Sequence, residues 1–146
     1  ISAHTLNDYK QNRFFGLDIK TWSKEGIVDE IVAYPWNDLP VDVDWFVSVV
    51  DTAKTKLYIE MMPRKMSPEQ YRAKAIELYN KGVYGLSFWD TNMRHTRLKQ
   101  WSMIRRLGHK DMLKQWDDGN SSLFRIIKIR KINNYRTDKY SPGDCY

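Results

Sequence analysis

The sequence lacks most of the residue patterns that mark a cross-link, a metal or a cofactor. It has a single cysteine, Cys145, so an intrachain disulfide is excluded. His95 and His109 stand fourteen residues apart with no acid or cysteine at ligand spacing, so we expect no metal site. There is no glycine-rich phosphate loop, Cys–His pair or serine elbow, which argues against a bound cofactor.

Long hydrophobic runs are missing as well. No apolar stretch approaches the roughly 18 residues that a membrane-spanning helix needs, so we expect no membrane partner. The first residue is isoleucine, and a leader segment can lie upstream or have been removed. The sequence therefore leaves the compartment open, export included.

The chain is instead rich in aromatic residues. Six tryptophans and nine tyrosines stand in 146 residues. Such rings fill cores, and they also stack on the apolar faces of sugars and bases. For any single ring we expect core filling more often than ligand stacking.

Positive charge is in excess, and the excess is local. The formal net charge is +6, and six basic residues crowd into the last quarter of the chain: Arg125, Lys128, Arg130, Lys131, Arg136 and Lys139. Isoleucines alternate with the first of them, so Arg125–Ile132 is predicted to be a strand or extended arm. Because no nucleic-acid motif accompanies it, we interpret the basic face as solvated and do not expect nucleic acid as the partner.

A regular spacing of strand-like runs indicates the fold class. Three apolar runs end at Tyr34, Met62 and Asp90, and 62 − 34 and 90 − 62 both equal 28. One amphipathic helical pattern lies between consecutive runs, and a strand, a helix and two loops together take about 30 residues. The chain therefore reads as α/β, with three consecutive βα units of a (β/α)8 barrel. Three units cannot close a barrel, so we expect a piece of a larger one. The pattern also allows an open three-layer sheet.

The expected elements follow from this spacing and from local end signals. Strands are predicted at Ile27–Tyr34, Leu57–Met62 and Leu86–Asp90. Helices are predicted from Asp18 to Lys24, after Asp44, from Ser67 to Gly82, from Thr96 to Gly108 and, as a short turn, at Met112–Trp116. The first fifteen residues read as an irregular loop that enters a helix. We divide the chain into a barrel part, 1–116, and a basic C-terminal extension, 117–146.

Polar and aromatic residues gather where the predicted strands end. In parallel α/β folds the active site lies at the carboxyl ends of the strands. The candidate substrate-binding residues there are Tyr34, Trp36, Asn37, Asp38, Arg64, Trp89 and Asn92. Carboxylates and amides suit sugar hydroxyls and rings suit their C–H faces, so we expect a carbohydrate ligand.

Glu60 and Asp90 are the candidate catalytic residues. Glu60 lies inside an apolar strand, where a carboxylate must be paired, protonated or placed in a cavity. The 28-residue spacing sets Glu60 opposite Val32 and Phe88, two residues short of Asp90, so both acids are expected on one face. Diagonal neighbours lie about 7–8 Å apart, within the range a glycosidase needs. The plainer alternative ties Glu60 to Arg64 or to a backbone donor and makes Asp90 a cap.

Several short motifs resemble a known family. Gly16-Leu-Asp18, Glu25-Gly-Ile-Val-Asp29, Met62-Pro-Arg64, Tyr71-Arg-x-Lys-Ala75, Gly82-x-x-Gly85 and Phe88-Trp-Asp90 stand in order along the chain. Together with Trp22 and the Trp101–His109 helix end, they resemble the C-terminal part of the bacterial family 10-like glycosyl hydrolases. The resemblance covers roughly Gly16 to Leu113.

The resemblance implies more than the residues do alone. It implies that the three strands are the sixth to eighth of a (β/α)8 barrel, with Glu60 at the position of a seventh-strand nucleophile. The partner acid would come from the fourth strand, which the chain does not contain. The expected function is therefore part of a glycoside hydrolase-like barrel, with a non-catalytic carbohydrate-binding module as the alternative. Alone, the fragment is expected to be inactive and to self-associate or pair with its missing half.

Overall fold

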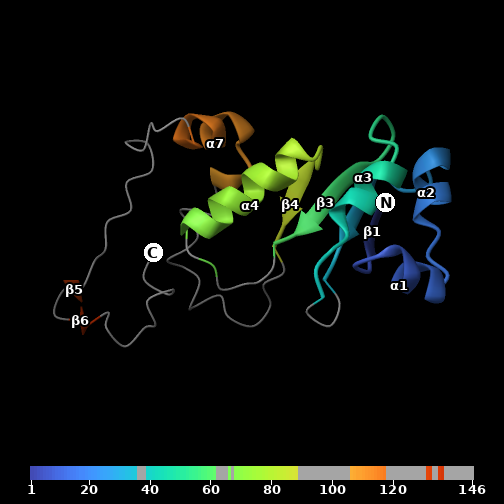
Figure 1. Cartoon of the computed structure of the whole chain (residues 1–146), viewed down its shortest axis with the longest axis horizontal. Coiled ribbons are helices and arrows are strands. Elements are labelled where there is room, and N and C mark those ends of the chain that lie inside the picture. Colours follow the sequence, from blue (N-terminus) through green and yellow to red (C-terminus); the bar gives the residue numbers. More distant parts are fainter. Residues whose placement is uncertain are drawn as a thin grey trace. The chain divides into compact units, whose positions relative to one another are not determined.

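The described part of the chain is a mixed α/β structure built on a four-stranded parallel sheet (Figure 1). This computed structural model describes residues 1–35, 39–61, 66, 68–88, 106–117, 131–132 and 135–136. The strands follow one another across the sheet in chain order: β1 (Ser2–Thr5), β2 (Glu30–Ala33), β3 (Lys56–Glu60) and β4 (Gly85–Ser87). All three pairings are parallel.

The first strand was not predicted, and the expectation of a loop over Ile1–Phe15 is wrong. Its sequence Ser-Ala-His-Thr carries no apolar pattern, and it is a strand because it pairs in register with β2. Helix α1 (Tyr9–Phe14) follows at once, capped by the Asp8 carboxylate, which accepts from the Gln11 N–H at 2.8 Å. The buried Asn12 amide fixes the turn between them, since its two ends bind the Leu6 N–H and C=O.

Helix α2 (Ile19–Glu25) confirms its predicted end signals. The Asp18 carboxylate accepts from the Thr21 N–H at 3.1 Å, and Gly26 ends the helix at φ +69°, a left-handed conformation that glycine adopts without strain. On the buried side of the helix, the Ser23 hydroxyl accepts from the Asp51 N–H at 2.7 Å. This bond ties α2 to the segment that follows the next helix.

Helix α3 (Val43–Val49) has its N-cap two residues earlier than we expected. Asp42, not Asp44, is the N-cap, and its carboxylate accepts from the Trp45 N–H at 3.0 Å. Asp44 lies in the first turn, where an acid also opposes the helix dipole favourably, so the sequence carries two acids that each fit a helix start. The fully buried Phe46 ring lies on this helix, which packs against β3.

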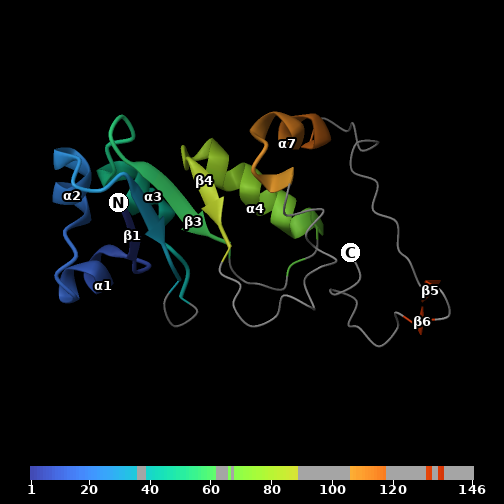
Figure 2. The ribbon, with the colours of Figure 1, turned by 180° about the vertical axis from the view of Figure 1, so that it is seen from behind.

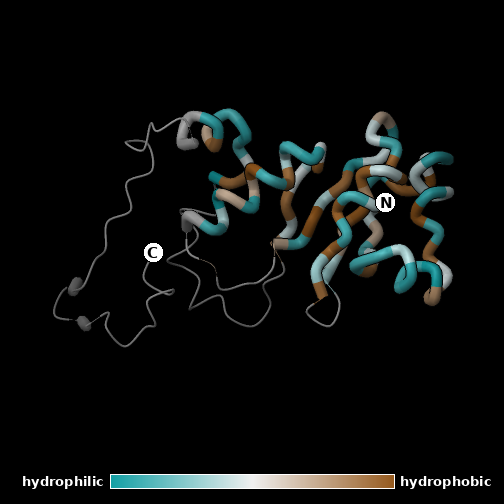
Figure 3. Tube along the Cα trace, viewed as in Figure 1, coloured by the Kyte–Doolittle hydropathy of each residue, from teal (hydrophilic) through white to brown (hydrophobic). Residues whose placement is uncertain are grey.

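The two faces of the sheet differ in chemistry. On one face the side chains of Ile31, Ala33, Leu57, Ile59 and Met61 are each at most 1% exposed. The opposite face carries Glu30, Val32, Lys56, Tyr58 and Glu60 by strand alternation. In Figure 3 the brown, hydrophobic stretches of the tube run along the strands, whereas α1 is largely teal.

The register of the sheet is shorter than the 28-residue spacing. Val32 pairs with Tyr58, a separation of 58 − 32 = 26, and Glu60 pairs with Ser87, a separation of 87 − 60 = 27. Glu60 is therefore opposite neither Val32 nor Phe88, and that expectation is wrong. The spacing was measured between strand ends, whereas the ladder is set by the length of each loop and crossover.

The helix after β3 has the predicted limits. Helix α4 (Pro68–Asn80) starts at its proline, the position where a missing N–H costs nothing, and Gly82 follows at φ +94°. The Val83 N–H donates to the Leu78 C=O at 3.1 Å, which closes the helix end. Ser67 lies outside the described residues, so the capping box stays a prediction.

The remaining elements are short. Helix α7 (Lys110–Asp117) confirms and lengthens the predicted turn, and residues 106–107 are helical before the turn at Gly108. Strands β5 (Lys131–Ile132) and β6 (Tyr135–Arg136) form an antiparallel pair. The rest of the predicted helix from Thr96, and most of the basic arm, lie outside the described residues. Among the helices described, none combines the length and apolar character needed to cross a membrane.

The chain divides into two units, which are considered separately. The first comprises Ile1–Arg64 and Glu77–Trp89 and holds the parallel sheet. The second comprises Lys65–Ile76 and Asp90–Tyr146. Among its described residues, the buried apolar side chains are Met66, Tyr71, Ala75, Leu107 and Leu113. Our division of the sequence at residues 116 and 117 stays a prediction.

Candidate functional site at the carboxyl edge of the sheet

The carboxyl ends of the four strands lie at one edge of the sheet, and two predicted site residues are found there. Tyr34 directly follows β2, and Glu60 is the last residue of β3. The Tyr34 N–H donates to the Thr5 C=O at 3.0 Å, which carries the ladder past the end of β2. The other predicted site residues lie outside the described part of the chain: Trp36, Asn37, Asp38, Arg64, Trp89, Asp90 and Asn92.

Glu60 is buried although it stands at the end of a strand. It is 3% exposed and pairs with Ser87 across the β3–β4 ladder. Next to it, the Met61 N–H donates to the Ser87 C=O at 2.8 Å and holds the two strand ends together. By alternation its side chain shares a face with Tyr58, away from the apolar face of Leu57 and Ile59. A carboxyl group is thus fixed at the edge, on the polar face.

Asn7 is a candidate that sequence reasoning missed. It follows β1 at this same edge, is 2% exposed, and has an amide oxygen with no hydrogen-bond partner. Its backbone is fixed, because its C=O accepts from the Asp42 N–H at 2.8 Å. Its amide nitrogen donates to the Asp8 carboxylate at 3.4 Å. Buried polar atoms are nearly always paired, so an unpaired one beside a strand end is notable. Because strand β1 was not predicted, the sequence did not indicate that Asn7 lies at a strand end.

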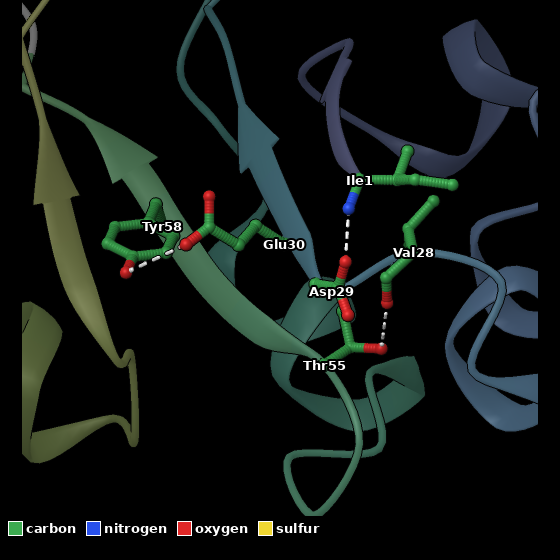
Figure 4. Close-up of polar contacts among 6 residues, drawn as sticks. All are labelled: Ile1, Val28, Asp29, Glu30, Thr55 and Tyr58. Atoms are coloured by element: carbon green, nitrogen blue, oxygen red, sulfur yellow. Dashed lines mark hydrogen bonds and ion pairs between the residues drawn. The ribbon is translucent and has the colours of Figure 1, made fainter.

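The opposite, amino edge of the sheet is closed by polar contacts (Figure 4). There the Thr55 hydroxyl donates to the Val28 C=O at 3.0 Å, and the Tyr58 hydroxyl donates to the Glu30 carboxylate at 3.4 Å. The amino group of Ile1 and the Asp29 carboxylate form an ion pair. Groups satisfied in this way hold strands together, so the amino edge reads as structural.

Tyr58 is the centre of that amino-edge arrangement. Burial raises the pKa of its hydroxyl above the ordinary tyrosine value, and the negative charge of Glu30 raises it further. Its ring lies against Gly85, where an added Cβ would stand 2.6 Å from the Tyr58 Cε1. The Tyr84 ring packs at 5.5 Å from that of Tyr58, and the Lys56 ammonium lies 4.9 Å from the Tyr84 centroid.

Among the described residues, no three His, Cys, Asp or Glu side chains lie close enough together to hold a metal ion. The carboxyl edge therefore offers one buried carboxyl group, one buried amide and one tyrosine from three neighbouring strands. These groups can hold hydroxyl groups and exchange a proton.

No known protein family, curated protein or solved structure was found to match the chain.

Proposed function

We propose that the chain is part of a (β/α)8-type barrel that acts on or binds carbohydrate at the carboxyl edge of its sheet. Sequential strand order supports the barrel. Doubly wound sheets reverse their order at a switch point, whereas β1-β2-β3-β4 has no reversal. With right-handed crossovers, such an order puts every crossover helix on one face, as the outer ring of a barrel requires.

The unpredicted strand leaves the position of Glu60 in the proposed barrel unchanged. If β2, β3 and β4 are the sixth, seventh and eighth strands, β1 is the fifth. Glu60 then ends the seventh strand, as the resemblance to the family 10-like glycosyl hydrolases implies. We assign the polar face that carries Glu60 to the interior of such a barrel, since the opposite, apolar face suits packing against the outer helices.

The single observation that carries the proposal is the burial of Glu60 at a strand end. A carboxyl group held at 3% exposure at a strand end has a fixed position at the edge where the strands of the sheet end. In parallel α/β folds the active site lies at this edge, where carboxyl groups transfer protons or attack the substrate. In a hydrolase Glu60 would be the nucleophile or the general acid–base. The expectation that Asp90 shares its face depended on the 28-residue spacing, which the pairing of Glu60 with Ser87 does not keep.

Glycosidase assays on the full-length parent protein test this role. Glu60→Gln should lower kcat by about a hundredfold or more, since the amide neither attacks nor exchanges a proton. Glu30→Gln is the matched control, because Glu30 lies on the same face but at the amino edge. Unchanged turnover in Glu60→Gln, or equal loss in both variants, would remove Glu60 from the catalytic machinery. A single copy of this chain is expected to be inactive.

A non-catalytic carbohydrate-binding module is the second candidate. The buried amide of Asn7 favours this candidate, because its oxygen can accept a hydrogen bond from a sugar hydroxyl and takes no part in proton transfer. Titration of tryptophan fluorescence with a panel of oligosaccharides separates the two candidates. Saturable quenching with no product would support the binding module, and product formation would decide for the hydrolase.

A further inference from the structure

Two aromatic rings from different helices pack together at the carboxyl edge of the sheet. Tyr9 is the first residue of α1, and Trp45 lies in the first turn of α3. Their ring centroids are 5.8 Å apart, and the ring planes are tilted by 55°. Each helix begins after the carboxyl end of a strand, so both first turns belong to this edge. In both views α1 lies at the end of the sheet toward which the strand arrows point (Figures 1 and 2).

Hydrogen bonds fix the position of this pair of rings. The Asn7 C=O accepts from the Asp42 N–H at 2.8 Å, and Asp42 is the N-cap of the helix that carries Trp45. The next residue after Asn7 is Asp8, which caps the helix that carries Tyr9. The two first turns are therefore tied to each other at the end of β1. A pair of rings held in this way loses little freedom when a ligand binds, which favours affinity.

The two rings differ in how much of their surface is covered. Trp45 is half-buried, and its ring packs on the fully buried Phe46 ring with centroids 4.7 Å apart. Tyr9 is 47% exposed, although it contacts the Trp45 ring. A ring that only filled the core would be covered as Phe46 is. The outer surface of the pair is therefore open to a ligand.

Arg13 brings hydrogen-bond donors to the same rings. Its Nη1 donates to the Tyr9 hydroxyl at 2.6 Å, and its Cζ lies 5.9 Å from the centroid of the Tyr9 ring. A guanidinium group has five N–H donors, and the Tyr9 hydroxyl takes one of them. Because Arg13 is exposed, the other donors can reach a ligand that lies on the rings.

The chemistry of this cluster selects its ligand. The apolar C–H face of a sugar stacks on aromatic rings, and its hydroxyl groups accept hydrogen bonds from a guanidinium group. An anionic ligand fits less well, because the Asp8 and Asp42 carboxylates stand at the two helix starts. A cationic ligand would be repelled by Arg13. A neutral sugar meets none of these penalties.

We propose that Tyr9, Trp45 and Arg13 form a stacking subsite for a neutral sugar unit at the carboxyl edge. The proposal rests on the carbohydrate function proposed above and adds a second contact to the buried Glu60. Strand β2 lies between β1 and β3, and neighbouring strands are about 4.8 Å apart, so the ends of β1 and β3 are roughly 10 Å apart. One sugar ring does not span that distance. The subsite and Glu60 would therefore hold different units of one oligosaccharide, and affinity should rise with oligosaccharide length.

Isothermal titration calorimetry of the full-length parent protein tests the subsite, with cello-, xylo- and malto-oligosaccharides of increasing length as probes. Tyr9→Ala should raise the Kd of the longest oligosaccharide that binds by about tenfold and remove most of the gain in affinity with length. Tyr9→Phe keeps the ring and should keep most of the affinity. Tyr84→Ala is the matched control, because Tyr84 is 51% exposed and also packs on a second ring beside a cation, but at the amino edge.

A second pair of variants tests the donor without touching the rings. Arg13→Gln should raise the Kd of the same oligosaccharide severalfold, because hydrogen bonds to its hydroxyl groups are lost. Lys10→Gln removes an exposed positive charge from the same helix and should leave the Kd unchanged. This pair carries the test if Tyr9→Ala fails to fold.

The outcomes separate the subsite from the proposed function. An unchanged Kd in Tyr9→Ala and Arg13→Gln, or an equal loss in Tyr84→Ala, would overturn the subsite and leave the carbohydrate proposal standing. Failure of the wild-type protein to bind any of the oligosaccharides would reject the carbohydrate proposal itself. Thermal melts of each variant detect a purely structural role, since rings that only pack α1 on α3 would change the melting temperature of Tyr9→Ala and not its Kd.

Discussion

At the scale of single residues, the sheet depends on a few residues that their surroundings allow no other residue to replace. Asn12 is one, since its amide holds both polar groups of Leu6 and the C=O of Asp8 at 2.8 Å. Gly85 is another, because the Tyr58 ring occupies the space that any Cβ would need. Neither role is visible in the sequence, where Gly85 stands just before the predicted strand Leu86–Asp90.

Gly85→Ala should destabilise the protein by about 1–3 kcal/mol, the usual cost of overpacking a well-filled site. Urea denaturation measures it. Gly108→Ala is the control, because nothing lies within 4 Å of a Cβ there. Tyr58→Val should rescue Gly85→Ala in the double variant if the ring is the obstacle. A full loss of stability that persists in the double variant would refute this explanation.

Tyr58 should titrate above the ordinary tyrosine pKa, because burial and then Glu30 disfavour its phenolate. The raised pKa favours folding below the unfolded value of about 10, and this stability is lost as the pH rises through the folded pKa. Ultraviolet difference titration of the wild type against Tyr58→Phe isolates the group. Glu30→Gln should lower the Tyr58 pKa, and an unchanged pKa would show that Glu30 does not act on it.

At the scale of elements, the helix ends were more predictable than the strands. Asp18, Gly26, Pro68 and Gly82 mark their helices as expected, because capping and backbone restriction act within a few residues. The start of α3 was misassigned, where Asp42 and Asp44 compete, and helix α1 was not predicted. Which carboxylate meets the Trp45 N–H depends on the path of the chain into the helix.

Asp42→Ala should cost about 1 kcal/mol of stability, because it leaves the Trp45 N–H without its cap. Asp44→Ala should cost less. Its partner is the Lys81 ammonium at 2.9 Å, and Asp44 is largely exposed in that ion pair, which is worth well under about 1 kcal/mol in water. Chemical denaturation of both variants at low and high salt measures the difference. Only the Asp44→Ala effect should shrink with salt, and the reverse order would identify Asp44 as the cap.

At the scale of the whole molecule, strand position should govern local stability. Strands β2 and β3 each have two neighbours, whereas β1 and β4 have one among the described residues. Amide exchange should therefore be slowest in β2 and β3, since edge strands open without breaking the whole sheet. Exchange that is uniform across the four strands would contradict this expectation.

The sequence by itself determined the parts of this protein that depend on local chemistry. Turn and cap residues placed four helix ends, apolar runs placed β2, β3 and β4, and a carboxylate in an apolar run identified Glu60. Tertiary structure alone decided the rest. The Ser-Ala-His-Thr segment becomes a strand only because β2 lies beside it, and the register of 26 and 27 residues follows from how loops and helices pack. Asn7 joins the site for the same reason, since burial belongs to the fold and cannot be read from one residue.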